Sequence, residues 1–150
     1  MSLSGSRMQI DHVATFSGTR AAFGRAFADF RRTLDQRELP QKARYECELV
    51  FEEVVTNILR HAYRDDREHD ITLSLDFPDS AIVMQFEDDG VPFDPSKHRP
   101  ATPSGSILDV PIGGRGLTLL QAAASRLEYT RTADHRNRLT VTVGTRSPTG

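Results

Sequence analysis

The sequence predicts a single domain that mixes strands and helices, in the order strand, helix, helix, two strands, helix and hairpin. Two patterns predict this order. Apolar and polar residues alternate in several short segments, as in half-buried strands, and the segments between them carry apolar residues at helical spacing. The length of 150 residues suits one domain with a buried core, and we find neither repeats nor a dividing linker.

The N-terminal part is expected to contain one strand and two helices. The strand covers residues 10–16, and Ser17 or Thr19 can cap a helix that ends near residue 36. Its apolar residues share one face, which suits core packing: Ala22, Phe23, Ala26, Phe27 and Phe30. A second helix is expected over residues 40–63, opened by Pro40.

The remaining strands are expected to form two hairpins. Strands at 71–77 and 81–87 are joined by a turn at 78–80, where Pro, Asp and Ser follow one another. The final hairpin pairs 127–132 with 139–145.

Between these hairpins, a third helix is expected to start near Leu117, after the glycines at 113–116. The segment 91–112 carries five of the eight prolines and has no periodicity. Irregular loops of this length are uncommon inside compact domains and often act as lids. We therefore expect 91–112 to be a lid, with a surface insertion as the alternative.

Composition limits the kinds of partner and compartment. The net charge is −2, with 37% hydrophobic and 27% charged residues, and no apolar run approaches the ~20 residues of a membrane span. Without a basic stripe, nucleic acid is not an expected partner. The single cysteine, Cys47, excludes an internal disulfide, agrees with a cytoplasmic location, and is expected to be a buried thiol.

The second helix carries a polar stripe beside its apolar face. Glu46, Glu53 and Asn57 lie within about 40° of one another around the helix axis. An asparagine amide oxygen is a ligand that suits Mg²⁺, which takes its other ligands from phosphate and water. Glu53, one turn earlier, is placed to accept a proton from a nucleophile. A solvated helix face with one local hydrogen bond is the alternative.

Asp88 is expected at the end of an apolar strand, where a partly buried carboxylate needs a hydrogen-bond donor. The exocyclic amine of adenine is such a donor, whereas guanine has a carbonyl in that position. Gly90 allows the backbone to approach a ring closely. An ordinary Asp-Gly turn is the alternative interpretation.

The glycines at 113, 114 and 116 favour a phosphate-binding turn. Gly113, Gly114 and Gly116 permit tight turns, and a helix starting near Leu117 would direct free amides and its positive dipole end at an anion. Arg115 adds a positive charge that can reach a phosphate.

Together the segments EEVVTN (52–57), EDDGVPFDP (87–95) and GGRGL (113–117) resemble the N, G1 and G2 boxes of the GHKL ATPase superfamily. The similarity is greatest to small anti-sigma-factor serine/threonine protein kinases and extends over residues 8–146, leaving 1–7 as a disordered or expression-derived N-terminus and 147–150 as a tail. It implies a Bergerat-type α/β two-layer sandwich, in which a mixed, mostly antiparallel sheet carries helices on one face and ATP binds under the lid.

The resemblance also implies roles for individual residues. Glu53 corresponds to the general base, Asn57 to the Mg²⁺ ligand and Asp88 to the residue that reads adenine. Gly90 and residues 113–117 correspond to the glycines that hold the nucleotide.

Two further residues are candidates for that site. His61 lies where the family often has a histidine near the phosphates, although a histidine at a helix end is also common. Many relatives have Gly-Thr before the last strand, where this chain has Arg136-Asn137, so Asn137 is a candidate neighbour of the adenine.

We therefore expect an ATP- and Mg²⁺-dependent serine/threonine kinase that acts as an anti-sigma regulatory factor by partner switching and phosphorylates an antagonist protein. The resemblance supplies the partners, which are the antagonist and a sigma factor. It is also compatible with a homodimer, for which Phe23, Phe27 and Phe30 could form the interface, with core packing as the alternative. One alternative is an ATP-binding regulator that sequesters a partner without phosphotransfer. Another is the catalytic domain of a split histidine kinase, with the phosphoacceptor on a companion protein.

Overall fold

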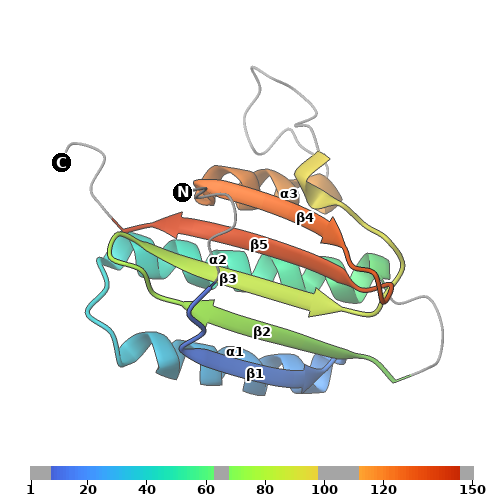
Figure 1. Ribbon diagram of the computed structural model, residues 1–150, viewed down its shortest axis with the longest axis horizontal. Helices are drawn as coiled ribbons and strands as arrows, with labels where there is room; N and C mark the ends of the chain where they lie inside the picture. Colours follow the sequence, from blue (N-terminus) through green and yellow to red (C-terminus); the bar gives the residue numbers. More distant parts are fainter. Residues whose placement is uncertain (1–7, 63–67, 98–111, 146–150) are drawn as a thin grey trace.

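In the computed structural model, three helices cover one face of a five-stranded sheet (Figure 1). The structure describes residues 8–62, 68–97 and 112–145, without the side chains at 61, 62, 96 and 112–116. The strand order is β1-β2-β3-β5-β4, and every pair of neighbouring strands is antiparallel. This is the two-layer α/β sandwich that the resemblance implied, with an antiparallel sheet throughout the described strands.

Most of the expected elements lie within a residue or two of their predicted bounds. The strands are β1 (His12–Ser17), β2 (Asp70–Asp76), β3 (Ala81–Asp88), β4 (Arg126–Arg131) and β5 (Asn137–Gly144). The helices are α1 (Arg20–Asp35), α2 (Gln41–Asn57) and α3 (Ile112–Ala123), with a π-helical turn η1 (Ile58–Ala62) and a 3₁₀ turn η2 (Pro95–Lys97). Pro40 is the N-cap of α2, and Tyr63 lies outside the described residues.

The N-terminus of α1 is fixed by Thr19, the second of the two predicted caps. Its side-chain oxygen accepts a hydrogen bond of 3.1 Å from the amide of Ala22. Such a cap satisfies one of the backbone donors that the first turn leaves free.

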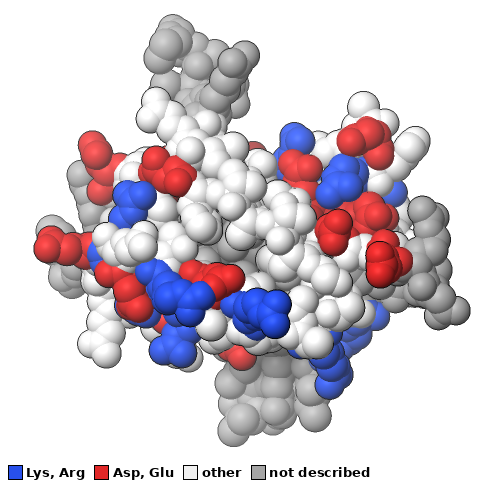
Figure 2. All heavy atoms as spheres, turned by 90° about the horizontal axis from the view of Figure 1, so that it is seen from below, with Lys and Arg blue, Asp and Glu red and all other residues white. Residues whose placement is uncertain are grey.

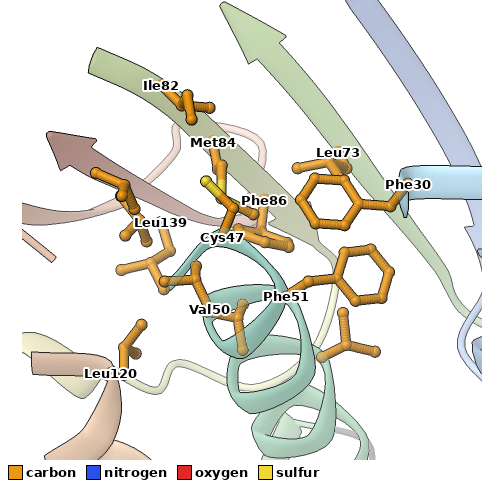
Figure 3. Packing of buried hydrophobic residues seen from close by; sticks show 14 of the residues in the cluster. Phe30, Cys47, Val50, Phe51, Leu73, Ile82, Met84, Phe86, Leu120 and Leu139 are labelled. Carbon is orange, nitrogen blue, oxygen red and sulfur yellow. The ribbon is translucent and has the colours of Figure 1, made fainter. Parts of the chain in front are cut away.

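Phe51 of α2 is the centre of the core between helices and sheet (Figure 3). Its ring centroid lies 4.9 Å from that of Phe30, and 5.4 and 5.8 Å from those of Phe27 and Phe23. The interpretation of these α1 phenylalanines as core residues is therefore confirmed. Cys47, one turn earlier on α2, is fully buried, and burial raises the pKa of its thiol to about 12.

The start of α3 differs from the prediction. The helix begins at Ile112, so the glycines at 113–116 lie inside its first turns, and the expected turn before a helix starting near Leu117 is wrong. Glycine in a helix costs about 1 kcal/mol relative to alanine but does not prevent it. Leu117 and Leu120 are buried in the core and anchor the helix, which extends backward through the glycines. Its leading amides are therefore near residue 112.

Charge is mixed on the face seen from the side of β1 and α1. Figure 2 shows acidic and basic side chains around a largely uncharged centre. Within 8–62, 68–97 and 112–145, none of the helices has the length and apolar character needed to cross a membrane.

Replacing Phe51 with alanine should lower the free energy of unfolding by about 3–5 kcal/mol, because the cavity left among the surrounding rings cannot collapse completely. Urea denaturation monitored by circular dichroism measures the change. The matched control is Tyr45→Ala on the same helix, whose side chain is 66% exposed and which should change stability by less than about 0.5 kcal/mol. Equal losses in the two variants would contradict this description of the core.

Candidate functional site

Two elements end and two begin at the same end of the sandwich. The last residues of α2 and β3 and the first of β5 and α3 meet there, at the right of Figure 1. A small pocket opens between them, with about 380 Å³ of empty space when the open solvent at its mouth is counted. Its lining comes from α2, η1, the sheet, α3 and the segment after β3: Val54, Asn57, Ile58, Phe86, Asp88, Phe93, Pro95, Leu120, Tyr129, Asn137 and Leu139.

Asp88, at the end of β3, is a carboxylate only 3% exposed in this otherwise largely apolar pocket. Its Oδ1 accepts hydrogen bonds from the Gly90 amide at 2.8 Å and from Nδ2 of Asn137 at 3.0 Å. Burial raises the pKa of Asp88, and the two hydrogen bonds oppose that rise without cancelling it. Folding therefore holds a desolvated carboxylate in place at the base of the pocket.

Asn137 is the residue that orients this carboxylate. It pairs directly with Asp88 across β3 and β5, and both side chains face the helices. Its Nδ2 also donates to the carbonyl of Val91 at 2.8 Å. Its Oδ1 accepts from the Tyr129 hydroxyl and, at 3.1 Å, from Nη1 of Arg131. All the hydrogen-bonding capacity of the Asn137 amide is thus used to join the segment after β3 to the last hairpin.

Arg131 and Tyr129 are parts of this site that the sequence did not single out. Arg131 donates from Nη1 to the carbonyl of Gly90 at 2.8 Å, so it fixes the glycine next to the buried carboxylate. The two residues belong to no motif. Their one sequence signal is the alternation in β4, which places them with Leu127 on the face toward the helices.

Asn57 reaches the same pocket from the end of α2. Its side chain is 5% exposed, and its Nδ2 finds no acceptor among the described residues. An unsatisfied buried donor costs about 1–3 kcal/mol. The α-helix ends at this residue and continues as a π-helical turn, a deviation that often occurs at functional sites. A ligand with an acceptor atom would satisfy the Asn57 amide.

Glu53 lies one helical turn before Asn57 and is partly buried, but it is not among the residues that line the pocket. Burial raises the pKa of Glu53, and the charge of Glu52 adds to that rise, while Arg60 opposes it. A carboxylate with a raised pKa is a stronger base than an ordinary glutamate.

The remaining predicted site residues are only partly described. Gly90 is buried beside Asp88. Leu117 packs in the core and does not line the pocket. The side chains of His61 and Arg115 lie outside the described residues, and the backbone of Gly113, Gly114 and Gly116 is helical.

The described start of the predicted lid lies against the pocket. Phe93 and Pro95 belong to its lining, and Nε2 of Gln121 on α3 donates to the carbonyl of Pro95 at 3.3 Å. This contact joins the start of η2 to α3. Residues 98–111 of the predicted lid lie outside the described residues.

Comparison with known proteins agrees with this architecture. The histidine kinase-like ATPase domain family matches residues 16–143, and the chain belongs to that family. Membership indicates an ATP-binding domain, since ATPase domains of this superfamily bind ATP, usually with Mg²⁺. Comparison with the curated proteins finds no match.

Among solved structures, the chain is similar to the histidine kinase domain of a blue-light activated histidine kinase from Erythrobacter litoralis EL346. The sequences are 19% identical and the TM-score is 0.49. The match covers 83% of this chain and 60% of that one, so this chain spans about three fifths of the length of that kinase domain.

Replacing Asp88 with asparagine should raise the free energy of unfolding at pH 7. The asparagine oxygen still accepts from Gly90 and Asn137, while the cost of the buried charge disappears. Because folding raises the pKa of Asp88, protonation of this carboxyl stabilises the folded state. This stabilisation is fully present below the unfolded pKa, near 3.9, and is lost as the pH rises through the folded pKa. Urea denaturation between pH 4 and pH 8 should therefore show a weaker pH dependence in the variant.

Asn137→Ala is the comparison variant, because it removes a donor and leaves the carboxylate underbonded. It should lose about 3 kcal/mol, since an unsatisfied buried charge costs more than a neutral group. If Asp88→Asn destabilised the fold as much as Asn137→Ala, burial would not be the main influence on the pKa of this carboxyl group.

Proposed function

We propose that the pocket binds ATP with Mg²⁺ and that the domain phosphorylates a serine or threonine of an antagonist protein in a partner-switching pathway. The observation that supports this most strongly is the meeting of two buried polar groups in one apolar pocket. The Asp88 carboxylate and the Asn57 amide, whose Nδ2 has no acceptor among the described residues, come from elements far apart in the sequence. The carboxylate needs a hydrogen-bond donor and the amide nitrogen needs an acceptor, and ATP carries both.

Adenine suits the Asp88 side of the pocket. Both hydrogen bonds that the described residues make to this carboxylate fall on Oδ1, which leaves Oδ2 to accept from the exocyclic amine of adenine. Phe86, Phe93 and Leu139 supply apolar surface for a flat ring. Guanine would place a carbonyl oxygen against the carboxylate and be repelled.

The phosphates and Mg²⁺ suit the Asn57 side. The buried amide nitrogen can donate to a phosphate oxygen, and the amide oxygen of the same group is a ligand type that Mg²⁺ accepts alongside phosphate and water. The amides at the start of α3, near residue 112, face no competing helical acceptor and are of the kind that binds phosphate.

Glu53 is the proposed general base. Bound ATP would supply the γ-phosphoryl group, which passes to the acceptor oxygen as its bond to ADP breaks. Glu53 takes the proton that the serine or threonine hydroxyl loses, and its raised pKa suits that task. The products are ADP and a phosphoprotein.

The acceptor type and the partners are supported by the resemblance of the three segments to anti-sigma-factor kinases. On that basis the unphosphorylated antagonist competes with a sigma factor for this domain, which functions as an anti-sigma factor. A homodimer and a cytoplasmic location belong to the same proposal.

Glu53→Gln should reduce phosphotransfer by about 10²–10⁴-fold, because the amide cannot accept the hydroxyl proton. The assay mixes purified protein, radiolabelled ATP, Mg²⁺ and the antagonist encoded by a neighbouring gene, and measures phosphoserine and phosphothreonine. Calorimetry serves as the control and should give unchanged ATP affinity for the variant. If the wild type bound ATP but formed no phosphoprotein, the kinase proposal would be wrong and a sequestering regulator would be favoured. Acid-labile phosphohistidine would favour a split histidine kinase.

The rate of phosphotransfer should also depend on pH through the protonation of Glu53. Transfer requires the deprotonated carboxylate, so kcat should fall on the acidic side with a midpoint above the ordinary glutamate value of about 4.3. The rate is measured between pH 4 and pH 8 with saturating ATP and antagonist. A midpoint at or below the ordinary value would exclude Glu53 as the base.

A further inference from the structure

A second hollow lies between the start of α1 and the end of α2. It is an open depression with about 850 Å³ of empty space, open solvent included, and is lined by Arg20, Phe23, Thr56, Leu59 and Arg60. Phe23 and Leu59 are partly buried against the core and form an apolar floor. The two arginines are exposed and form a cationic rim. None of these residues lines the pocket assigned to the nucleotide.

The rim arginines differ from three other arginines of the helical layer. Arg31, Arg32 and Arg44 each form an ion pair with a carboxylate. Within the described part of the chain, neither Arg20 nor Arg60 makes a salt bridge. At the lower right of Figure 2, basic side chains gather at the end of the molecule where α1 begins. Two exposed guanidinium groups that form no salt bridge among the described residues, over an apolar floor, favour a ligand with carboxylates and an apolar group.

Glu53 stands between this hollow and the nucleotide pocket. Helical geometry of about 100° per residue places Thr56 about 60° to one side of Glu53 and Asn57 about 40° to the other. Thr56 lines the hollow, and Asn57 lines the pocket. Arg60 is close enough to act electrostatically on Glu53. A base in this position can receive a hydroxyl from one side while the phosphates lie on the other.

From this placement we propose that the hollow docks an acidic segment of the acceptor protein and presents its serine or threonine to Glu53. The inference rests on the proposed function, because it assigns the nucleotide to the neighbouring pocket. Carboxylates of the segment pair with Arg20 and Arg60, and an apolar side chain packs on Phe23 and Leu59. The apolar floor favours a protein segment over a free phosphate, which gains nothing from it.

The test uses fluorescein-labelled serine peptides and fluorescence anisotropy, without nucleotide. One peptide carries a leucine and several Asp and Glu residues, and matched peptides replace the acids with Asn and Gln or with Lys. The acidic peptide should bind the wild-type protein, and Arg20→Gln with Arg60→Gln should weaken binding at least about tenfold. Arg32→Gln on the exposed face of α1 is the matched control and should bind as the wild type does. Thermal unfolding verifies that each variant is folded.

Four outcomes would overturn the proposal. They are no binding of the acidic peptide, equal binding of the neutral or basic peptide, retained binding by the folded double variant, and, in a separate calorimetric titration with ATP, an equal loss of ATP affinity in that variant. The last would assign the hollow to the nucleotide. Because the assay contains no ATP, peptide binding through the two arginines would stand even if the domain transferred no phosphate. Failure of docking is thus distinct from failure of the kinase.

Discussion

The hydrogen bond between the buried Asp88 carboxylate and the Asn137 amide is the constraint on which the site depends. It joins the end of β3 to the start of β5, where the two residues pair directly in the sheet. A slip of one residue in this register would turn the carboxylate to the open face of the sheet, together with the core side chains of its strand. The core and the base of the pocket therefore require the same register, so the stability of the sheet also determines where the carboxylate lies.

The helix α2 contributes side chains to the pocket on one side and to the hollow on the other. Phe51 and Cys47 anchor its apolar face in the core, which sets the rotation of the helix about its axis. That rotation directs Asn57 into the pocket and Thr56 into the hollow beside α1, with Glu53 on the ridge between them. Core packing in the middle of the helix thus determines which groups meet a ligand at its end.

Much of this arrangement could be predicted from the sequence. Alternation and helical spacing gave the strands and the first two helices, and the residue types of Asn57 and Asp88 predicted two polar groups that the fold indeed brings to one pocket. Local patterns failed at the glycines of 113–116, because glycine tolerates both turn and helix and the buried leucines that follow decide between them.

Tyr129 and Arg131 could not be predicted as site residues, since their role depends on which strand pairs beside β5. The placement of Arg20 and Arg60 around one hollow likewise depends on how the start of α1 packs beside the end of α2 and the turn η1, segments far apart in the sequence. Neither the strand pairing nor the placement of the two arginines leaves a periodic pattern in the sequence.

The central claim, that the pocket recognises an adenine nucleotide through Asp88, is tested most directly by calorimetric titration of the intact protein with ATP and with GTP, each in the presence of Mg²⁺. The account predicts binding of ATP and at least about 100-fold weaker binding of GTP, because a buried carboxylate that accepts from an amine is left facing a carbonyl. No heat with ATP from protein shown to be folded, or equal affinity for the two nucleotides, would contradict it.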